Sequence, residues 1–508
     1  MSYEMIALFM FASMMLMLFT GQRVFGAIGG VAALTALWLW GVGGSDLPFT
    51  ATMKLMKWYP LLTLPMFIFM GYVLSESKIA DDLYKMFHVW MGPVSGGLAI
   101  GTIGLMVLIS AMNGLSVAGM AIGSTIALPE LLKRGYDKKM VTGVIQAGSS
   151  LGILVPPSVV LVLYAMIARQ PVGQLWLAGV VPGLMMAGMF VVYIYVRCKL
   201  NPSLGPTLDK EERKAYDQSQ PLKINIWGWI IAIAAVALFM ALQRDIIVIP
   251  KTPTASIAFL VLVGLCAWIL YKIKDRLNWY FVIPMAEKYH LLLAGVLPLV
   301  IFFSMMVPFV KGWTSLTESS AVGAVVAFMA AVLKGRMNRH VFETSVRQTL
   351  AISCMFMWII LAAMAFGAVF DGLGAVKAIE NLFTEKMGLS PWTILILMQL
   401  SFLLMGTFLD DTAMLVIVAP LYIPLVGDLG FDLVWYGVLY TVTTQIAYMT
   451  PPFGYNLFLM RAMAPKEISM RDIYGSIWPF VSVMVLALIL FMLFPGIALW
   501  LPHTVYGL

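Results

Sequence analysis

Two adjacent carboxylates interrupt a long apolar stretch of this sequence. Asp410 and Asp411 stand near the middle of residues 391–427, where most neighbouring side chains are apolar. A carboxylate at the centre of a membrane costs on the order of 2.5 to 3.5 kcal/mol on insertion scales. A bound cation, protonation or the amide groups of a helix N-terminus would each offset this cost. Direct coordination of a cation and N-capping of a following half-helix therefore both remain open.

Two Pro-Pro pairs interrupt other apolar runs. Pro156-Pro157 and Pro451-Pro452 each lack backbone donors and clash with the preceding turn, at a cost of roughly 3 kcal/mol in a helix. The carbonyl groups released by such a break can ligate a hard cation such as Na⁺, and the N-terminus of the next half-helix favours an anion. Small or oxygen-bearing residues flank the two pairs, namely Gly148, Ser149, Ser150, Gly152, Thr450, Gly454 and Asn456.

The composition indicates the environment of these residues. Of 508 residues, 61% are hydrophobic and 11% are charged, and the mean hydropathy is +0.93. These values exclude an ordinary soluble protein and predict many membrane spans. We expect continuous spans at residues 4–20, 23–42, 60–76, 176–197, 225–242, 255–271, 291–310, 319–334, 348–370 and 474–500.

Two apolar stretches are too long for one span and are interrupted midway. Residues 95–132 contain Asn113 and Ser116, and residues 391–427 contain the aspartate pair. We expect each stretch to form a re-entrant helical hairpin. Its break must lie inside protein or a wet cavity, because lipid offers no partners to exposed backbone groups.

The interruptions recur at one offset. Five residues of the first half are found again 295 positions later, as the pairs Pro129 and Pro424, Gly135 and Gly430, Asp137 and Asp432, Pro156 and Pro451, and Pro157 and Pro452. We therefore predict an all-α membrane protein built from an internal repeat. Its parts are residues 1–200 (three spans, hairpin 95–132, broken helix 139–169 and one span), a two-span insert with polar connectors at 201–290, and residues 291–508 (three spans, hairpin 391–427, broken helix 433–461 and one span).

The two repeats are expected to have opposite orientations. An odd number of crossings separates the loop at residues 133–139, which is rich in Lys and Arg, from the loop at residues 428–432, which carries two Asp and no base. The positive-inside rule places the first loop in the cytoplasm and both chain termini in the periplasm. The net charge of +7 lies in such short loops, so we do not expect nucleic acid as a partner. Inverted repeats with broken helices are typical of secondary transporters.

Other classes of function find little support. The sequence has no phosphate-binding loop, nucleophile elbow or metal-ligand spacing, so we expect neither an enzyme nor a cofactor. A channel, or a membrane-embedded enzyme using Asp410 or Asp411, remains an alternative. Glu318 precedes an apolar run and is expected to begin a helix.

Several segments, taken together, resemble the large membrane subunit (DctM-like) of tripartite ATP-independent periplasmic (TRAP) transporters. They cover both repeats and are Leu64-Pro65-Met66-Phe67, Leu128-Pro129-Glu130, Gly152-Ile153-Leu154-Val155-Pro156-Pro157-Ser158, Thr317-Glu318-Ser319-Ser320, Phe408-Leu409-Asp410 and Thr450-Pro451-Pro452-Phe453-Gly454-Tyr455-Asn456.

This resemblance implies a Na⁺-coupled importer of a small organic acid in the bacterial inner membrane, working by an elevator movement. It also implies two partners, a small membrane subunit of about four spans and a periplasmic substrate-binding protein. A stand-alone Na⁺/dicarboxylate carrier of the same architecture is the alternative. Candidate Na⁺-binding residues, by resemblance, are Ser110, Asn113, Ser116, Gly148, Gly152, Pro156, Gly406, Asp410, Thr412, Thr450 and Pro452. Candidate substrate-binding residues are Asn113, Ser149, Ser150, Asp411, Gly454 and Asn456.

Overall fold

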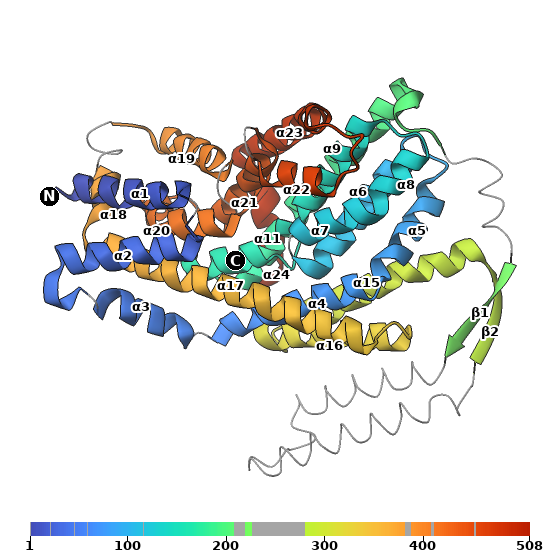
Figure 1. The fold of residues 1–508 in the computed structure, drawn as a ribbon, viewed down its shortest axis with the longest axis horizontal. Helices are drawn as coiled ribbons and strands as arrows, with labels where there is room; N and C mark the ends of the chain where they lie inside the picture. The colour runs from blue at the N-terminus through green and yellow to red at the C-terminus, as the bar shows by residue number, and fades with distance from the viewer. Residues whose placement is uncertain are drawn as a thin grey trace, which may run out of the picture.

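The protein is an elongated bundle of helices (Figure 1). The computed structural model describes residues 2–20, 22–44, 46–57, 59–114, 116–207, 219–225, 280–381, 388–407, 411–451 and 454–507. The N-terminus lies at one end of the bundle, and a small sheet lies at the opposite end. The spans predicted at 225–242 and 255–271 lie outside the described residues.

The first repeat contains eleven α-helices among its described residues. They are α1 (Tyr3–Phe19), α2 (Val24–Leu39), α3 (Asp46–Met56), α4 (Thr63–Glu76), α5 (Ile79–Met91), α6 (Gly97–Asn113), α7 (Ser116–Ile122), α8 (Leu128–Lys133), α9 (Lys138–Ser150), α10 (Val159–Ala168) and α11 (Val172–Leu200). Short 3₁₀ turns occur at Gly41–Gly43, Tyr59–Leu62, Leu151–Ile153 and Pro202–Leu204, and a π-helical turn at Gly123–Ala127 joins α7 to α8.

The second predicted repeat, with the end of the connector before it, contains ten α-helices among its described residues. Its helices are α15 (Glu287–Val310), α16 (Leu316–Leu333), α17 (Arg339–Gly372), α18 (Ala375–Asn381), α19 (Pro391–Gly406), α20 (Asp411–Asp428), α21 (Leu433–Met449), α22 (Tyr455–Met463), α23 (Met470–Leu493) and α24 (Gly496–Tyr506). Glu318 begins α16 as expected, since its backbone amide and carboxylate form a reciprocal capping box with Ser315.

The repeat is visible in matching local geometry. Gly135 and Gly430, which are 295 residues apart, have φ angles of 78° and 80°, a left-handed conformation that glycine adopts without steric cost. Two residues later, Asp137 and Asp432 each accept a hydrogen bond from the backbone amide three residues further on, at 3.0 and 2.7 Å. The same turn and the same N-cap therefore start α9 and α21.

Helices dominate the described chain, but the all-α prediction omitted one sheet. Strand β1 (Ser219–Asn225) pairs antiparallel with β2 (Tyr280–Ala286), with Ser219 opposite Ala286. Both strands lie in the connectors that the sequence indicated only as polar. Their pairing joins segments far apart in the chain, so no local pattern predicts it.

Several helices also differ from the expected spans. Helices α3 and α18 lie where no element was expected, and α17 begins nine residues before the span expected at 348–370. Residues 79–91, which were assigned no element, form α5, a helix too polar and too short to count as a span. The span expected at 474–500 ends at Leu493, because Phe494 leaves the helical region and Pro495 begins a new helix, α24. Within the described residues, four helices are long and apolar enough to cross a membrane, namely α11, α16, α17 and α23.

The helices α9 and α21 form the centre of the protein. Every residue from Met140 to Ser150 and from Val434 to Met449 is buried. Helices α6, α7 and α23 pack on α9, and α19, α20, α11 and α23 pack on α21. Helices α1 to α4, α16 and α17 contact one another along a separate flank of the bundle (Figure 1). The two central helices carry the breaks, so their surroundings define the candidate site.

The start of α5 is tied to the flank by an ion-pair cluster. Asp82 pairs with Lys334 at 2.8 Å and with Arg336 at 2.9 Å, and its side chain is 21% exposed. Arg336 also donates to the carbonyl of Lys78 at 2.6 Å. Burial alone would raise the pKa of the Asp82 carboxyl, but hydrogen bonds from Lys334 and Arg336 outweigh burial and hold this pKa below its ordinary value.

We expect Asp82→Asn to lower the free energy of unfolding by about 1 to 3 kcal/mol, since it removes charge-assisted hydrogen bonds from a partly buried cluster. A lowered pKa means that this contribution is present above the unfolded-state value of about 4 and is lost as pH falls through the folded-state value. Thermal unfolding of both proteins between pH 3 and pH 8 measures it. Asp81→Asn is the matched control, because no ion pair of Asp81 is found in the described ranges. An equal loss in both variants would contradict the assignment.

Candidate functional site

The first broken helix is held open by side-chain hydrogen bonds. Helix α9 ends at Ser150, the turn Leu151–Ile153 follows, and α10 starts after Ser158. The Ser158 hydroxyl donates to the carbonyl of Ile153 and accepts from the amide of Leu161 at 3.1 Å. Ser158 thus pairs a backbone carbonyl before the break and a backbone amide after it, which a continuous helix would pair with its own backbone. These hydrogen bonds stabilise the break at Pro156-Pro157.

The break between α6 and α7 docks directly on this first broken helix. Gly114 has a φ angle of 64°, and its carbonyl accepts a hydrogen bond from the amide of Val159 at 3.3 Å. A Cβ atom at Gly114 would lie 2.3 Å from the carbonyl oxygen of Pro157. Both the backbone conformation and the close approach require glycine here.

The second broken helix opens at Thr450. Helix α21 ends at Met449, and Thr450 is extended, with its hydroxyl donating to the carbonyl of Ile446 at 2.6 Å. Gly454 precedes α22 with a φ angle of 39°, and a Cβ atom there would lie 2.9 Å from the carbonyl oxygen of Tyr448. Pro451 is part of the turn, and Pro452 lies outside the described residues.

One hydrogen bond joins the two repeats at their breaks. The side-chain amide of Gln445 on α21 donates to the carbonyl oxygen of Ser150 at 2.8 Å, and these residues are 295 positions apart. The contact therefore joins two residues separated by the same offset that relates the matched motifs. The Gln445 Oε1 atom is buried and has no hydrogen-bond partner in the part of the chain that the structure describes. The sequence analysis missed Gln445; an amide inside an apolar run was the available signal.

Two further buried polar side chains lie on helices that pack against α9. Asn456, in the first turn of α22, is 0% exposed, and neither its Oδ1 nor its Nδ2 has a hydrogen-bond partner among described residues. The same holds for the hydroxyl of Ser116, at the start of α7. Helix α22 contacts both α7 and α9. Leaving a buried polar group unpaired costs about 1 to 3 kcal/mol, so these atoms are suited to a ligand.

The remaining predicted residues surround the same breaks. Ser149 and Ser150 are fully buried, and their hydroxyls donate to carbonyls one turn earlier in α9. The glycines allow close packing, since a Cβ at Gly148 would lie 2.7 Å from Met106 and one at Gly406 would lie 2.6 Å from Ala447. Gly152 and Pro156 are buried. Ser110, Asn113, Asp411 and Thr412 are placed by their backbone alone, and Asp410 lies outside the described residues.

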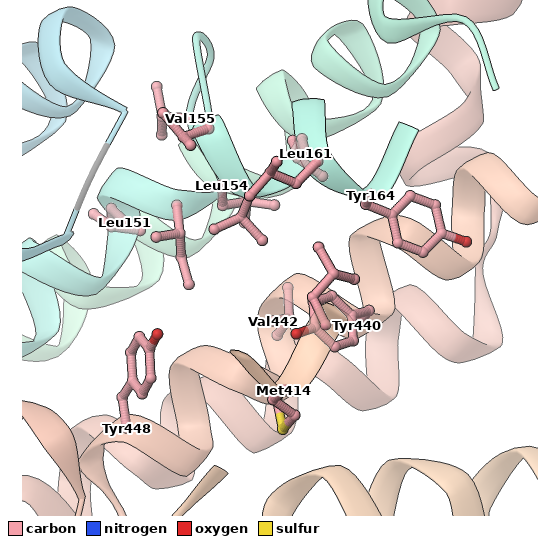
Figure 2. Close-up of a cluster of buried hydrophobic side chains, with 14 of the residues drawn as sticks. Leu151, Leu154, Val155, Leu161, Tyr164, Met414, Tyr440, Val442 and Tyr448 are labelled. Carbon is pink, nitrogen blue, oxygen red and sulfur yellow. The ribbon is translucent and has the colours of Figure 1, made fainter. Parts of the chain in front are cut away.

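Apolar side chains fill most of the contact between the two broken helices. Figure 2 shows Leu151, Leu154 and Leu161 of the first broken helix facing α21, which carries Tyr440, Val442 and Tyr448. The rings of Tyr164 and Tyr440 stack with centroids 6.3 Å apart. The site residues Ser149, Ser150 and Asn456 are each 0% exposed, so the site is closed in this conformation.

The site side chains that the structure describes offer neutral oxygen and amide groups. Within the described ranges, no three His, Cys, Asp or Glu side chains gather as a metal cluster. Carbonyl, hydroxyl and amide oxygens are ligands for hard cations. The N-termini of α10 and α22 add partial positive charge beside them.

We expect Gly114→Ala to destabilise the protein by about 2 to 4 kcal/mol, because its Cβ would collide with backbone and its φ angle is strained. Gly135→Ala is the matched control: its φ angle is 78° but a Cβ there would meet nothing within 4 Å, so strain of about 1 kcal/mol is expected. Thermal unfolding of both variants compares the two. Equal losses would show that the Gly114 contact with Pro157 is unimportant.

Known proteins match this chain along almost its whole length. The chain is 28% identical over 454 residues to the C4-dicarboxylate TRAP transporter large permease protein DctM of Vibrio cholerae, covering 88% of this chain and 87% of that protein. It is 26% identical over 455 residues to the ectoine TRAP transporter large permease protein TeaC of Halomonas elongata, with coverage of 88% and 87%.

A solved structure supports the same fold. The Alcanivorax borkumensis YdaH transporter superposes with a TM-score of 0.57 at 14% identity, covering 91% of this chain and 90% of that one. The family model described as tripartite ATP-independent periplasmic transporter, DctM component, matches residues 11–497. The chain therefore belongs to the DctM component family of tripartite ATP-independent periplasmic transporters.

Proposed function

We propose that this protein carries a small organic acid across the bacterial inner membrane, driven by Na⁺. The observation that carries the proposal is the junction of the two breaks, where Gln445 binds the Ser150 carbonyl and buried polar atoms of Gln445, Asn456 and Ser116 lack partners in the described chain. Paired breaks with unsatisfied polar atoms suit ligands that enter and leave.

Sodium would bind at the ends of the broken helices. Carbonyl oxygens near Ser150 and Thr450, together with the hydroxyl of Ser116, supply the oxygen ligands that a hard cation prefers. Since Na⁺ would occupy a buried site, its charge requires compensation. The substrate carboxylate supplies a negative charge, so binding of the ion and of the substrate would reinforce one another.

The substrate carboxylate would bind near Asn456. Its amide offers two N–H donors, and the N-terminus of α22 presents further backbone donors and partial positive charge. The relatives named for C4-dicarboxylate and for ectoine indicate that the family carries different carboxylate-bearing molecules. The proposed class of substrate is therefore a small molecule that carries a carboxylate.

Transport would proceed by an elevator movement. Because the site residues are fully enclosed, a substrate enters only if elements move. We infer that the pairs α6–α8 and α19–α20, which form the proposed re-entrant hairpins, move with both broken helices. The flank of α1 to α4 and α15 to α17 would stay fixed in the membrane.

The proposal includes two partners and an orientation. A small membrane subunit would complete the permease, and a periplasmic binding protein would deliver the substrate, as the family's tripartite name implies. The basic loop at residues 133–139 supports an orientation in which that side faces the cytoplasm and both termini face the periplasm.

The central test uses proteoliposomes that contain both membrane subunits and receive substrate from the binding protein. We expect uptake to require an inward Na⁺ gradient and to stop when K⁺ replaces Na⁺. Equal uptake without a Na⁺ gradient would refute the coupling. Uptake without the binding protein would instead favour a stand-alone carrier.

We expect Asn456→Leu to raise the KM for uptake at least tenfold, since one charge-assisted hydrogen bond contributes about 1.5 to 3 kcal/mol. The same variant should unfold at an equal or higher temperature, because it removes a buried amide that has no partner in the described chain. Transport kinetics and thermal unfolding together check both parts.

Gln146→Leu is the matched control. Its side-chain nitrogen donates to the Thr142 carbonyl at 3.1 Å and to the Ser476 hydroxyl at 3.3 Å, while its Oε1 has no partner in the described chain. The substitution therefore removes two hydrogen bonds that Asn456 lacks. This variant should lower stability and leave the KM unchanged. If Asn456→Leu is instead destabilised with an unchanged KM, Asn456 is a structural residue.

A further inference from the structure

A groove with a cationic end runs between α11 and α23, away from the candidate site. Its volume is about 580 Å³, and it is lined on the α11 side by Met185, Gly188, Val192, Val196, Arg197 and Leu200, with Val483 and Leu486 opposite. The floor is apolar over most of its length, and Arg197 is the charged residue of the lining. Such a surface fits a molecule with one long apolar part and one anionic part.

The position of the cations fits a membrane interface. Lys199 lies two residues beyond Arg197, with its ammonium 5.6 Å from the centre of the Tyr195 ring. The loop that follows α11 accepts a hydrogen bond from the amide of Asp137 at 3.2 Å through the carbonyl of Leu204. The charged end of the groove therefore lies beside the basic loop at residues 133–139. Tyrosines next to Lys and Arg are characteristic of the headgroup region.

The length of the groove fits an acyl chain. From Met185 to Leu200, α11 rises roughly 22 Å at about 1.5 Å per residue. One leaflet of the hydrocarbon core is about 15 Å deep, so the groove is long enough for the acyl chain of one leaflet. A second groove on the other side of α11, about 350 Å³ in volume, is lined by apolar residues alone, among them Phe87, Ile103 and Val191. Arg197 in the lining, with Lys199 close by in the last turn of α11, therefore distinguishes the α11–α23 groove from an ordinary lipid-facing surface.

We propose that the α11–α23 groove binds an anionic phospholipid of the cytoplasmic leaflet. Its acyl chain lies along Gly188 and Val192, and its phosphate is held by Arg197 and Lys199. This site is independent of the proposed Na⁺ and substrate site, because none of the lining residues belongs to the two breaks. Two cations near the surface should favour an anionic over a zwitterionic headgroup by about 25-fold.

The experiment titrates the purified complex of both membrane subunits in detergent with phosphatidylglycerol or phosphatidylcholine. Thermal unfolding and retention of lipid in native mass spectrometry are measured. We expect phosphatidylglycerol to bind about 25-fold more tightly than phosphatidylcholine. The double variant Arg197→Gln/Lys199→Gln should lose this preference, whereas Lys311→Gln, which removes an exposed lysine elsewhere, should retain it.

A second variant tests the acyl-chain half of the site. A Cβ atom at Gly188 would meet nothing within 4 Å, so Gly188→Phe fills the groove without a clash and should fold. It is expected to abolish tight retention of phosphatidylglycerol. Full retention in Gly188→Phe, equal binding of both lipids, or an equal effect from glycerol phosphate alone would each overturn the proposal.

Discussion

The hydrogen bond from the Gln445 amide to the Ser150 carbonyl joins α21 to the end of α9, one turn before α21 itself ends. In a membrane each buried backbone group needs a partner within the protein. A helix break is therefore tolerable only where another element meets it. At the first break, the carbonyl of Gly114 accepts a hydrogen bond from Val159, and Gln445 of α21 donates to Ser150. The arrangement of the surrounding helices therefore follows from the need to cover the breaks.

The two repeats are alike around the breaks and differ outside them. The first repeat divides one segment into α3 and α4, with Pro60 in the turn between them, while the matching segment of the second repeat is the continuous helix α17 of 34 residues. Residue 355, at the same offset from Pro60, is a methionine. Without proline the helix continues. The ion pairs of Asp82 with the loop between α16 and α17 add a second difference.

The sequence alone predicted the features that depend on local chemistry. The offset of 295 and the helix start at Glu318 follow from residue types at short spacing. The N-caps at Asp137 and Asp432 were not predicted, although aspartate before a helix is a typical cap. The pairing of β1 with β2 and the contact of Gln445 with Ser150 join residues far apart in the chain, so no window of sequence reveals them. Helix α5 was missed because its charged residues hide a buried face that includes Leu83.

The β1–β2 ladder has a consequence for the spacing of the chain around it. Ser219 lies opposite Ala286, and Asn225 lies opposite Tyr280, so the segment between the strands leaves and re-enters the protein at one point. An insertion with adjacent ends can change in length without altering the distance between the repeats. The ladder therefore fixes the distance between the chain segments on either side of it, whatever the length of the chain that joins its strands.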